Sequence, residues 1–156
     1  MDAFVEKDRC GDMKPLIIVL EDSNDRMDWL RNTIIGVDII HHLSVLSFVQ
    51  AVNEHKDSGR LRLVVFDHDL GHTPPHDMYS PMVSHTTDAD GYTGHDAAKM
   101  LDSIPCAALV WSLNDSGRKR IGHELVSKCS GRVYAFPYGR DLRYLADVIL
   151  REAFPK

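Results

Sequence analysis

Short apolar runs alternate along the chain with longer segments of mixed polarity. Continuous apolar runs are expected for strands buried on both faces of a parallel sheet, and they predict strands over 16–20, 61–66, 106–111 and 133–136. A further short strand is predicted over 38–43. Helical patterns fill the intervals. They predict helices from a cap at Ser23 to about residue 35, over 45–55, around 97–101, from Asn114 or Asp115 to Cys129, and over 141–153.

This alternation of five strands and helices predicts an α/β fold with one open parallel sheet and helices on both faces. We expect a single domain over 15–156, after an N-terminal tail over 1–14, built as a three-layer sandwich with the flavodoxin-like strand order 2-1-3-4-5. A long polar insertion over about 71–94 follows the third strand. Loops of this length are often lids or binding loops, so we expect the insertion to lie over a site at the strand ends.

Two of the predicted strands end in acidic residues. The first runs into Glu21 and Asp22, and the third runs into Asp67, with Asp69 two positions further on. Ligands of open parallel sheets bind at the carboxyl ends of the strands, and clustered carboxylates need a cation or a proton between them. We therefore predict a divalent metal site formed by Glu21, Asp22, Asp67 and Asp69, with a turn or helix cap as the alternative role of Asp22. The donor set favours Mg²⁺ or Mn²⁺, and Zn²⁺ if a histidine joins the carboxylates.

Candidate groups for holding a phosphate lie near the same edge. Ser112 ends the fourth strand, and Asn114 opens the next helix, whose N-terminus attracts anions. Arg118 follows in a basic run that a solvated helix face explains equally well. Arg26, one turn into the first helix, and Arg140, after the fifth strand, are further candidates. A surface salt bridge is the alternative role of Arg26.

The histidines are candidates for proton transfer or metal ligation. Five of the nine lie near the acidic end of the third strand, at His68, His72, His76, His85 and His95. His68 is the strongest candidate because aspartates flank it. His76 and His85 are explained equally well as parts of a solvated loop. His41 and His42 are expected to lie away from this edge and to have a structural role.

Acidic residues, a hydroxyl and a proline stand at successive strand ends, namely Glu21-Asp22, Asp67, Ser112 and Pro137. This order resembles the receiver domains of two-component response regulators. The resemblance implies magnesium bound by the acidic residues, Asp67 as phosphoacceptor and Ser112 in contact with the phosphoryl group. Phe136 stands where receivers carry a lysine that contacts phosphoryl oxygens. Phosphorylation of Asp67, as in ordinary receivers, therefore ranks below the two functions given at the end of this subsection.

Two longer motifs are Asp67-His68-Asp69-Leu70-Gly71 and Ser112-Leu113-Asn114-Asp115-Ser116-Gly117, preceded by Leu20-Glu21-Asp22 and Arg26. Together they resemble the cyclic-phosphate processing receiver domains, a small receiver-like family, over roughly residues 16–140. The resemblance implies that nucleotide or RNA cyclic phosphates are processed. The family usually has a histidine where this chain has Trp111.

Composition narrows the classes of partner. The formal net charge of -5 argues against broad, charge-driven binding of nucleic acid. The longest apolar runs are only as long as strands, so we expect no membrane span. No signal region follows Met1, and the three cysteines show no metal-ligand spacing. These features favour a cytoplasmic protein with reduced thiols.

Two functions of different classes follow from these patterns. The first is a metal-dependent phosphoesterase, a hydrolase that acts on a cyclic phosphate or nucleotide phosphate, with Asp67, His68 and Ser112 as catalytic residues. Its substrate would be held by Arg26, Ser112, Asn114, Arg118 and Arg140. The alternative is a non-catalytic, receiver-like module that binds a phosphorylated ligand or protein. The expected ligand in either case is a phosphorylated small molecule or the end of an RNA or nucleotide.

Overall fold

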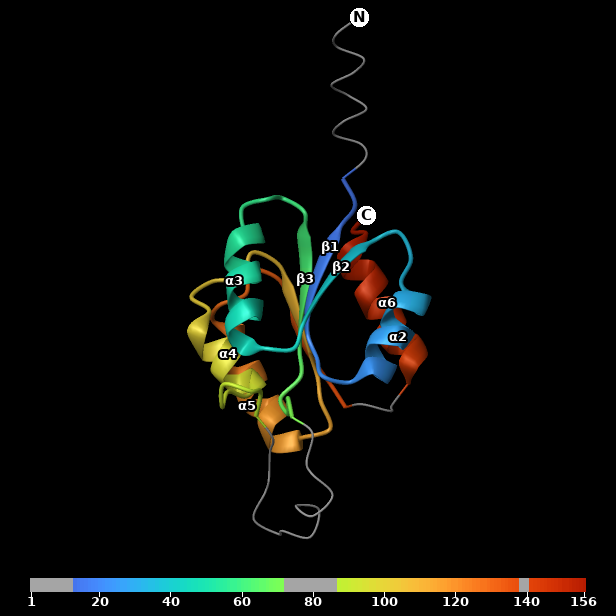
Figure 1. Ribbon diagram of the computed structural model, residues 1–156. Helices are drawn as coiled ribbons and strands as arrows, with labels where there is room; N and C mark the ends of the chain where they lie inside the picture. Colours follow the sequence, from blue (N-terminus) through green and yellow to red (C-terminus); the bar gives the residue numbers. More distant parts are fainter. Residues whose placement is uncertain (1–12, 72–86, 138–140) are drawn as a thin grey trace, which may run out of the picture.

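The computed structural model describes residues 13–71, 87–137 and 141–156, and its centre is a five-stranded parallel sheet (Figure 1). The strands are β1 (Leu16–Leu20), β2 (Asp38–His42), β3 (Leu61–Phe66), β4 (Ala107–Trp111) and β5 (Val133–Phe136). They are ordered β2-β1-β3-β4-β5, and each neighbouring pair is parallel. The predicted α/β class and strand order are confirmed. All the carboxyl ends of the strands therefore meet at one edge of the sheet.

The helices of the described segments cover both faces of this sheet, which makes three layers (Figure 1). One face carries α2 (Asn24–Thr33) and α6 (Leu142–Ala153). The other carries α3 (Val45–His55), α4 (Gly94–Met100) and α5 (Asp115–Val126). α5 ends earlier than the predicted Cys129, because Cys129 leaves the helix and forms an isolated bridge with Ile104.

Each face of the sheet buries its own apolar cluster. In β1, Leu16, Ile18 and Leu20 pack with the residues of α3, α4 and α5, whereas Ile17 and Val19 pack with those of α2 and α6. All five side chains are at most 1% exposed. A strand covered on both faces has no position left for a polar residue, which explains why β1 and β4 appear in the sequence as continuous apolar runs.

Side-chain caps begin most of these helices directly after a strand. Ser23 Oγ accepts a hydrogen bond from the Arg26 N–H at 3.3 Å, and Asn114 Oδ1 accepts one from the Gly117 N–H at 2.8 Å. Such caps satisfy N–H groups that have no partner inside the helix. Because each capped helix starts close to its strand, the first turns of α2 and α5 lie at the carboxyl edge of the sheet.

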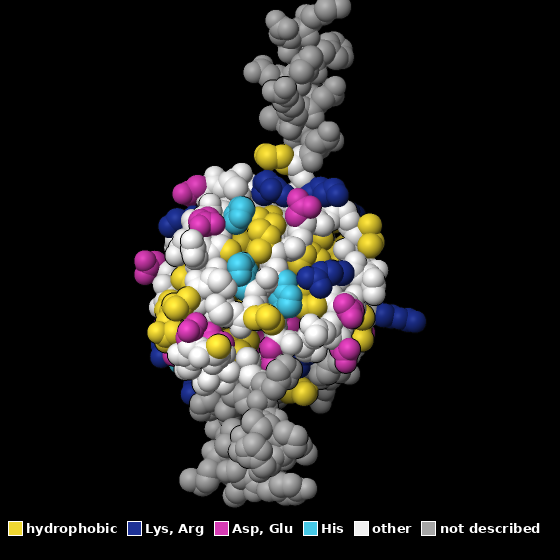
Figure 2. Space-filling model, viewed as in Figure 1, with side chains coloured by type: hydrophobic (Ala, Val, Ile, Leu, Met, Phe, Trp, Pro, Cys, Tyr) yellow, Lys and Arg dark blue, Asp and Glu magenta, His cyan; other side chains and the backbone are white. Residues whose placement is uncertain are grey.

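The surface seen in Figure 2 mixes acidic and basic side chains in small groups, and histidines lie among apolar side chains near its middle. No helix in the part of the chain that the structure describes is long and apolar enough to cross a membrane. Much of the predicted tail, most of the insertion and Arg140 lie outside the described residues.

Candidate functional site

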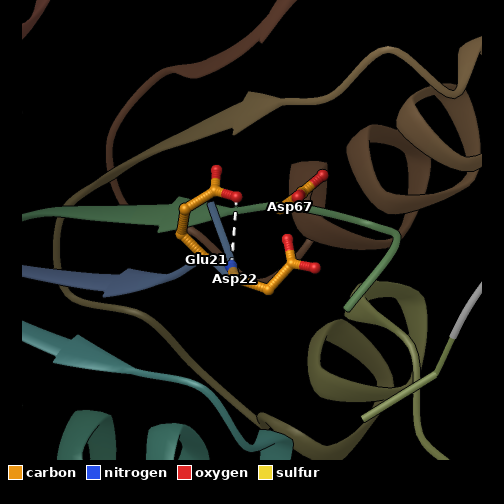
Figure 3. Close-up of side chains that lie close together, drawn as sticks. All are labelled: Glu21, Asp22 and Asp67. Atoms are coloured by element: carbon orange, nitrogen blue, oxygen red, sulfur yellow. Dashed lines mark hydrogen bonds between the residues drawn. The ribbon is translucent and has the colours of Figure 1, made fainter. Parts of the chain in front are cut away.

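Three carboxylates converge at the carboxyl edge of the sheet (Figure 3). Glu21 and Asp22 follow β1, Asp67 follows β3, and one oxygen of each lies within 4.8 Å of the others. β1 and β3 are neighbours, with Leu20 paired with Phe66, so the residues after the two strands lie side by side. Glu21 is 1% and Asp67 4% exposed. Most of this acidic cluster is therefore withdrawn from water.

Arg26 places a positive charge inside the acidic cluster. Its Nη1 atom lies 3.0 Å from Glu21 Oε2 and 3.2 Å from Asp67 Oδ2. The same atom donates to the Trp111 carbonyl at 3.2 Å, and the guanidinium carbon lies 5.4 Å from the centroid of the Trp111 ring. Arg26 is only 9% exposed. The surface salt bridge considered from the sequence is thus wrong, because this ion pair is buried.

The pKa values of the cluster reflect its burial. The pKa of Asp67 is raised to about 8, because desolvation and the charge of Glu21 raise it more than Arg26 lowers it. Burial also raises the pKa of Glu21, again against the effect of Arg26. One guanidinium therefore offsets only part of the cost of holding these carboxylates together, and the cluster favours a further cation or a proton.

The donor set of the cluster fits a hard divalent cation. Mg²⁺ and Mn²⁺ prefer carboxylate oxygens, and Mg²⁺ usually completes its shell with water and phosphate oxygens. Arg26 contacts one oxygen each of Glu21 and Asp67. Asp22 forms no ion pair with any residue that the structure describes, and it borders a surface pocket with Ser23, Asn24 and Asp25. The cluster is thus open to solvent beside Asp22.

His68 belongs to a second, polar cluster, formed by His68, Asp69, Asn114 and Gly117. Its Nδ1 atom lies 2.8 Å from Asp69 Oδ1 and 3.3 Å from Asn114 Nδ2. Asn114 Nδ2 also donates to Asp69 Oδ1 at 3.3 Å. The first turn of α5 packs on the imidazole, since a Cβ at Gly117 would lie 2.4 Å from His68 Cγ. The two longer sequence motifs therefore meet in this polar cluster.

The structure separates the predicted ligand Asp69 from the other three. Among the described residues, the group with metal-ligand spacing contains Glu21, Asp22 and Asp67. Asp69 instead holds the imidazole of His68 and the amide of Asn114. The chain turns after β3, which directs two aspartates of one short motif to different partners.

Of the remaining predicted residues, Ser112 and Arg118 form hydrogen bonds with backbone groups near the start of α5. Ser112, 1% exposed, accepts the Asn114 N–H on its Oγ at 3.2 Å. Arg118 donates to the Ser112 carbonyl at 2.8 Å and to the Asp115 carboxylate at 2.6 Å. Phe136 stacks on Tyr144, with ring centroids 5.7 Å apart. His72, His76, His85 and Arg140 lie outside the described residues.

His41 lies at this edge of the sheet, so the expectation that it is remote is wrong. Its Nε2 atom is 2.5 Å from the Glu21 carbonyl oxygen. β2 is the neighbour of β1, with His41 paired with Val19, and parallel pairing brings their carboxyl ends together. The strand order 2-1-3-4-5 already implies this position. His42, the next residue, bonds to Ser47 Oγ at 3.0 Å.

Two further residues were not assigned a role from the sequence. Asp88, 7% exposed, accepts the N–H groups of Val45, Asp90 and Tyr92 at 2.7–2.9 Å. It thereby ties the returning limb of the insertion to the start of α3. A Cβ at Gly94 would lie 1.8 Å from the Asp67 carbonyl oxygen, so α4 approaches this strand end closely. The Asp-x-Asp-Gly turn at 88–91 is the signal that could have identified Asp88.

Structural neighbours of the chain are signal receiver domains. One belongs to a protein assigned as a Luxo repressor from Vibrio parahaemolyticus, with 14% identity, a TM-score of 0.57 and 90% of each chain covered. Another is the CheY-like response regulator receiver domain protein from Methanospirillum hungatei JF-1, with 10% identity and a TM-score of 0.54, covering 90% of this chain and 94% of that one. The chain has the receiver fold.

A third neighbour with the receiver fold belongs to a modulated diguanylate cyclase from Desulfovibrio desulfuricans G20, with 13% identity and a TM-score of 0.53, over 90% of this chain and 94% of that one. No protein-family model matches the sequence, and no curated protein matches it. At these identities the neighbours show the fold alone. The resemblance to cyclic-phosphate processing domains therefore stays a prediction.

Proposed function

We propose that this receiver-like domain is a binding module that holds a divalent cation, Mg²⁺ or Mn²⁺, at Glu21, Asp22 and Asp67. The phosphoryl group of a small molecule, a nucleotide or an RNA end would bind next to that cation. The observation that carries the proposal is the approach of three carboxylates to within 4.8 Å at the carboxyl edge of the sheet. The raised pKa values of Glu21 and Asp67 support it, because a cation removes the repulsion that a single guanidinium leaves.

Each residue of the acidic cluster has a distinct part in this proposal. When bound, the cation would neutralise the carboxylates and attract phosphoryl oxygens. Arg26 would hold Glu21 and Asp67 in place through the contacts of its Nη1 atom. It also supplies positive charge near Asp67, which the lysine of receivers would otherwise supply at the position of Phe136. Ser112, at the end of β4, is the proposed hydroxyl contact for the phosphoryl group.

The contacts of His68 favour binding without turnover. The proposed catalytic role of this histidine needs its imidazole to exchange a proton with the ligand at the acidic cluster. In the structure its Nδ1 atom faces Asp69 and Asn114, and its ring packs on Gly117. Trp111, at the position of the family's histidine, offers no general acid or base. The alternative of a non-catalytic module therefore takes precedence here.

Tryptophan fluorescence gives a direct test of cation binding. The chain has two tryptophans, and both lie by the cluster: the rings of Trp29 and Trp111 are 5.4 Å apart, and Arg26 lies over Trp111. We expect a saturable fluorescence change on titration with MgCl₂. Asp67→Asn should weaken the apparent affinity at least about tenfold, a loss of about 1.4 kcal/mol. Asp28→Asn, an exposed change on the same helix as Arg26, is the matched control and should leave the titration curve unchanged.

Phosphorus NMR separates binding from turnover. The protein with saturating Mg²⁺ or Zn²⁺, which are both diamagnetic, is mixed with 2′,3′-cyclic, 3′,5′-cyclic and linear nucleotide monophosphates. Line broadening without a new resonance supports the binding module. A new product resonance that disappears in Asp67→Asn would establish the second candidate, the phosphoesterase, which the nearby His68–Asp69 pair favours. Lack of binding by every phosphate in the presence of bound cation would overturn the phosphoryl part of the proposal.

A further inference from the structure

A polar pocket lies on the other side of the β3 end, between the returning limb of the insertion, α4 and α5. Its volume is about 230 Å³. The lining residues include His68, Thr93, His95, Asp96, Lys99 and Arg120. This pocket shares only His68 with the clusters described above, and it contains none of the three carboxylates of the acidic cluster.

Arg120 is a second cation, beside Lys99, in the lining of this pocket. Within the described residues, its guanidinium forms no ion pair. Glu124, one turn further along α5, is the natural partner of an arginine at this spacing, but its Oε1 atom pairs with Lys128 Nζ at 3.0 Å. Arg120 therefore brings a full positive charge to the pocket wall.

Asp96, the acidic side chain among the described lining residues, already has partners. Asp96 Oδ2 accepts the Thr93 N–H at 2.9 Å and the Thr93 hydroxyl at 3.2 Å, while its Oδ1 lies 3.3 Å from Lys99 Nζ. The partners of the Asp96 carboxylate are thus Thr93, the cap of α4, and Lys99, in the same helix. With Lys99 and Asp96 cancelling each other, the formal charge of the lining is that of Arg120.

The pKa of His95 reflects its burial and the charges around the pocket. Burial lowers the pKa of this imidazole, and the charges of Lys99 and Arg120 lower it further, against smaller opposite effects of Glu124 and Asp96. The two cations come from different helices and both act on one ring, so their charges converge on the pocket. A neutral imidazole there offers one N–H donor and one acceptor.

We propose that this pocket binds a tetrahedral oxyanion of the phosphate class, either free phosphate or the terminal phosphate of an ester. The guanidinium of Arg120 presents a planar set of donors suited to phosphate oxygens, and Lys99 and His95 add donors from α4. The pocket is wide enough for one such group together with water. The site is independent of the proposed cation site, because no acidic ligand of the cluster lines it.

The test is a titration with sodium phosphate, followed by ¹⁵N–¹H NMR in EDTA so that no divalent cation contributes. We expect saturable shifts at the backbone amides of Gly91, Thr93 and His95. Arg120→Gln should weaken the affinity at least about tenfold, and Lys99→Gln should weaken it less because Lys99 is paired with Asp96. Lys119→Gln is the matched control on α5: this side chain is 74% exposed, pairs with Asp115 and should leave the affinity unchanged.

A parallel titration with adenosine 5′-monophosphate identifies the source of the phosphate. Tighter binding than that of inorganic phosphate assigns the pocket to an ester, and equal or weaker binding assigns it to the free anion. Shifts that rise linearly without saturation, or an unchanged affinity in a folded Arg120→Gln variant, would overturn the proposal. Because EDTA is present, these outcomes leave the proposed cation site untouched.

Discussion

The acidic and polar clusters begin at consecutive residues, Asp67 and His68, yet they differ in almost every physical respect. In the acidic cluster, buried carboxylates surround one guanidinium, and the pKa of Asp67 is raised to about 8. In the polar cluster, an imidazole, a carboxylate and an amide satisfy one another, and the imidazole packs against Gly117. Alternation along an extended chain separates Asp67 from His68, and the turn after β3 brings Asp69 beside His68. A motif that is continuous in the sequence is therefore divided between two sites.

The two clusters also differ in what stabilises them. Removing one member of a buried ion pair leaves an uncompensated charge, which costs more than the pair contributes. The hydrogen bonds of the polar cluster, two of which reach the partly exposed Asp69 carboxylate, contribute roughly 1–3 kcal/mol each. We therefore expect charge substitutions to affect the acidic cluster most, and steric substitutions to affect the polar cluster most.

Replacing Arg26 should give the largest effect. In Arg26→Met, Glu21 and Asp67 remain buried without their shared cation, and at about pH 8 we expect a loss of about 3–5 kcal/mol in the free energy of unfolding. Urea denaturation in EDTA measures it. Arg118→Met is the comparison, because the partner of Arg118, Asp115, is 62% exposed, and it should lose clearly less. Equal losses in the two variants would contradict the claim that burial makes the Arg26 ion pairs more important for stability.

A methyl group at Gly117 should disrupt the polar cluster. The added Cβ would lie 2.4 Å from His68 Cγ, so we expect Gly117→Ala to lose about 1–3 kcal/mol. In Gly122→Ala, on the same helix, the added Cβ meets nothing within 4 Å. That variant should be neutral or more stable by up to about 1 kcal/mol, because alanine favours helices. Thermal unfolding of both variants checks the prediction, and similar melting temperatures for the two would contradict it.

The pH dependence of stability should come mainly from the acidic cluster. A carboxyl whose folded pKa is about 8 holds its proton in the folded state at pH values where the unfolded chain has lost it. Between about pH 4 and pH 8 the folded state thus binds more protons, and the free energy of unfolding falls as pH rises, by at most about 1.4 kcal/mol per pH unit for one proton. Melting temperatures in EDTA should show this fall in the natural chain and a flatter profile in Asp67→Asn. A profile that rises over this range would contradict the account.

The smallest effect is expected at the helix cap of the polar cluster. Asn114 caps α5 through Oδ1 and donates to Asp69 through Nδ2. Asn114→Ala should cost about 1 kcal/mol, whereas Asn114→Ser, which keeps a capping oxygen, should recover most of that loss. Chemical denaturation of the two variants gives the comparison. Equal losses would mean that the bond to Asp69, and not the cap, carries the stability.

The strands and the acidic cluster could be predicted from the sequence because each follows from one local rule. Continuous apolar runs identify buried strands, and neighbouring parallel strands bring Glu21, Asp22 and Asp67 to one edge. The position of His41 next to Glu21 follows from the same strand order. The expectation that His41 lies away from this edge did not take that order into account. These features follow from the local sequence pattern together with the strand order.

The division of the motif could not be predicted, because it depends on packing between distant segments. Asp69 contacts Asn114 only because α5 approaches His68 at Gly117. The burial of Arg26 likewise depends on the carbonyl and ring of Trp111, at the end of β4. No spacing within either segment encodes these contacts.

The central claim is that Asp67 and Asp69, two residues apart, serve different sites. Isothermal titration calorimetry with MgCl₂ on Asp67→Asn and Asp69→Asn tests it most directly. The account predicts that Asp69→Asn binds Mg²⁺ within about twofold of the natural chain, while Asp67→Asn gives no saturable heat. Loss of binding in Asp69→Asn, or binding retained in Asp67→Asn, would contradict it.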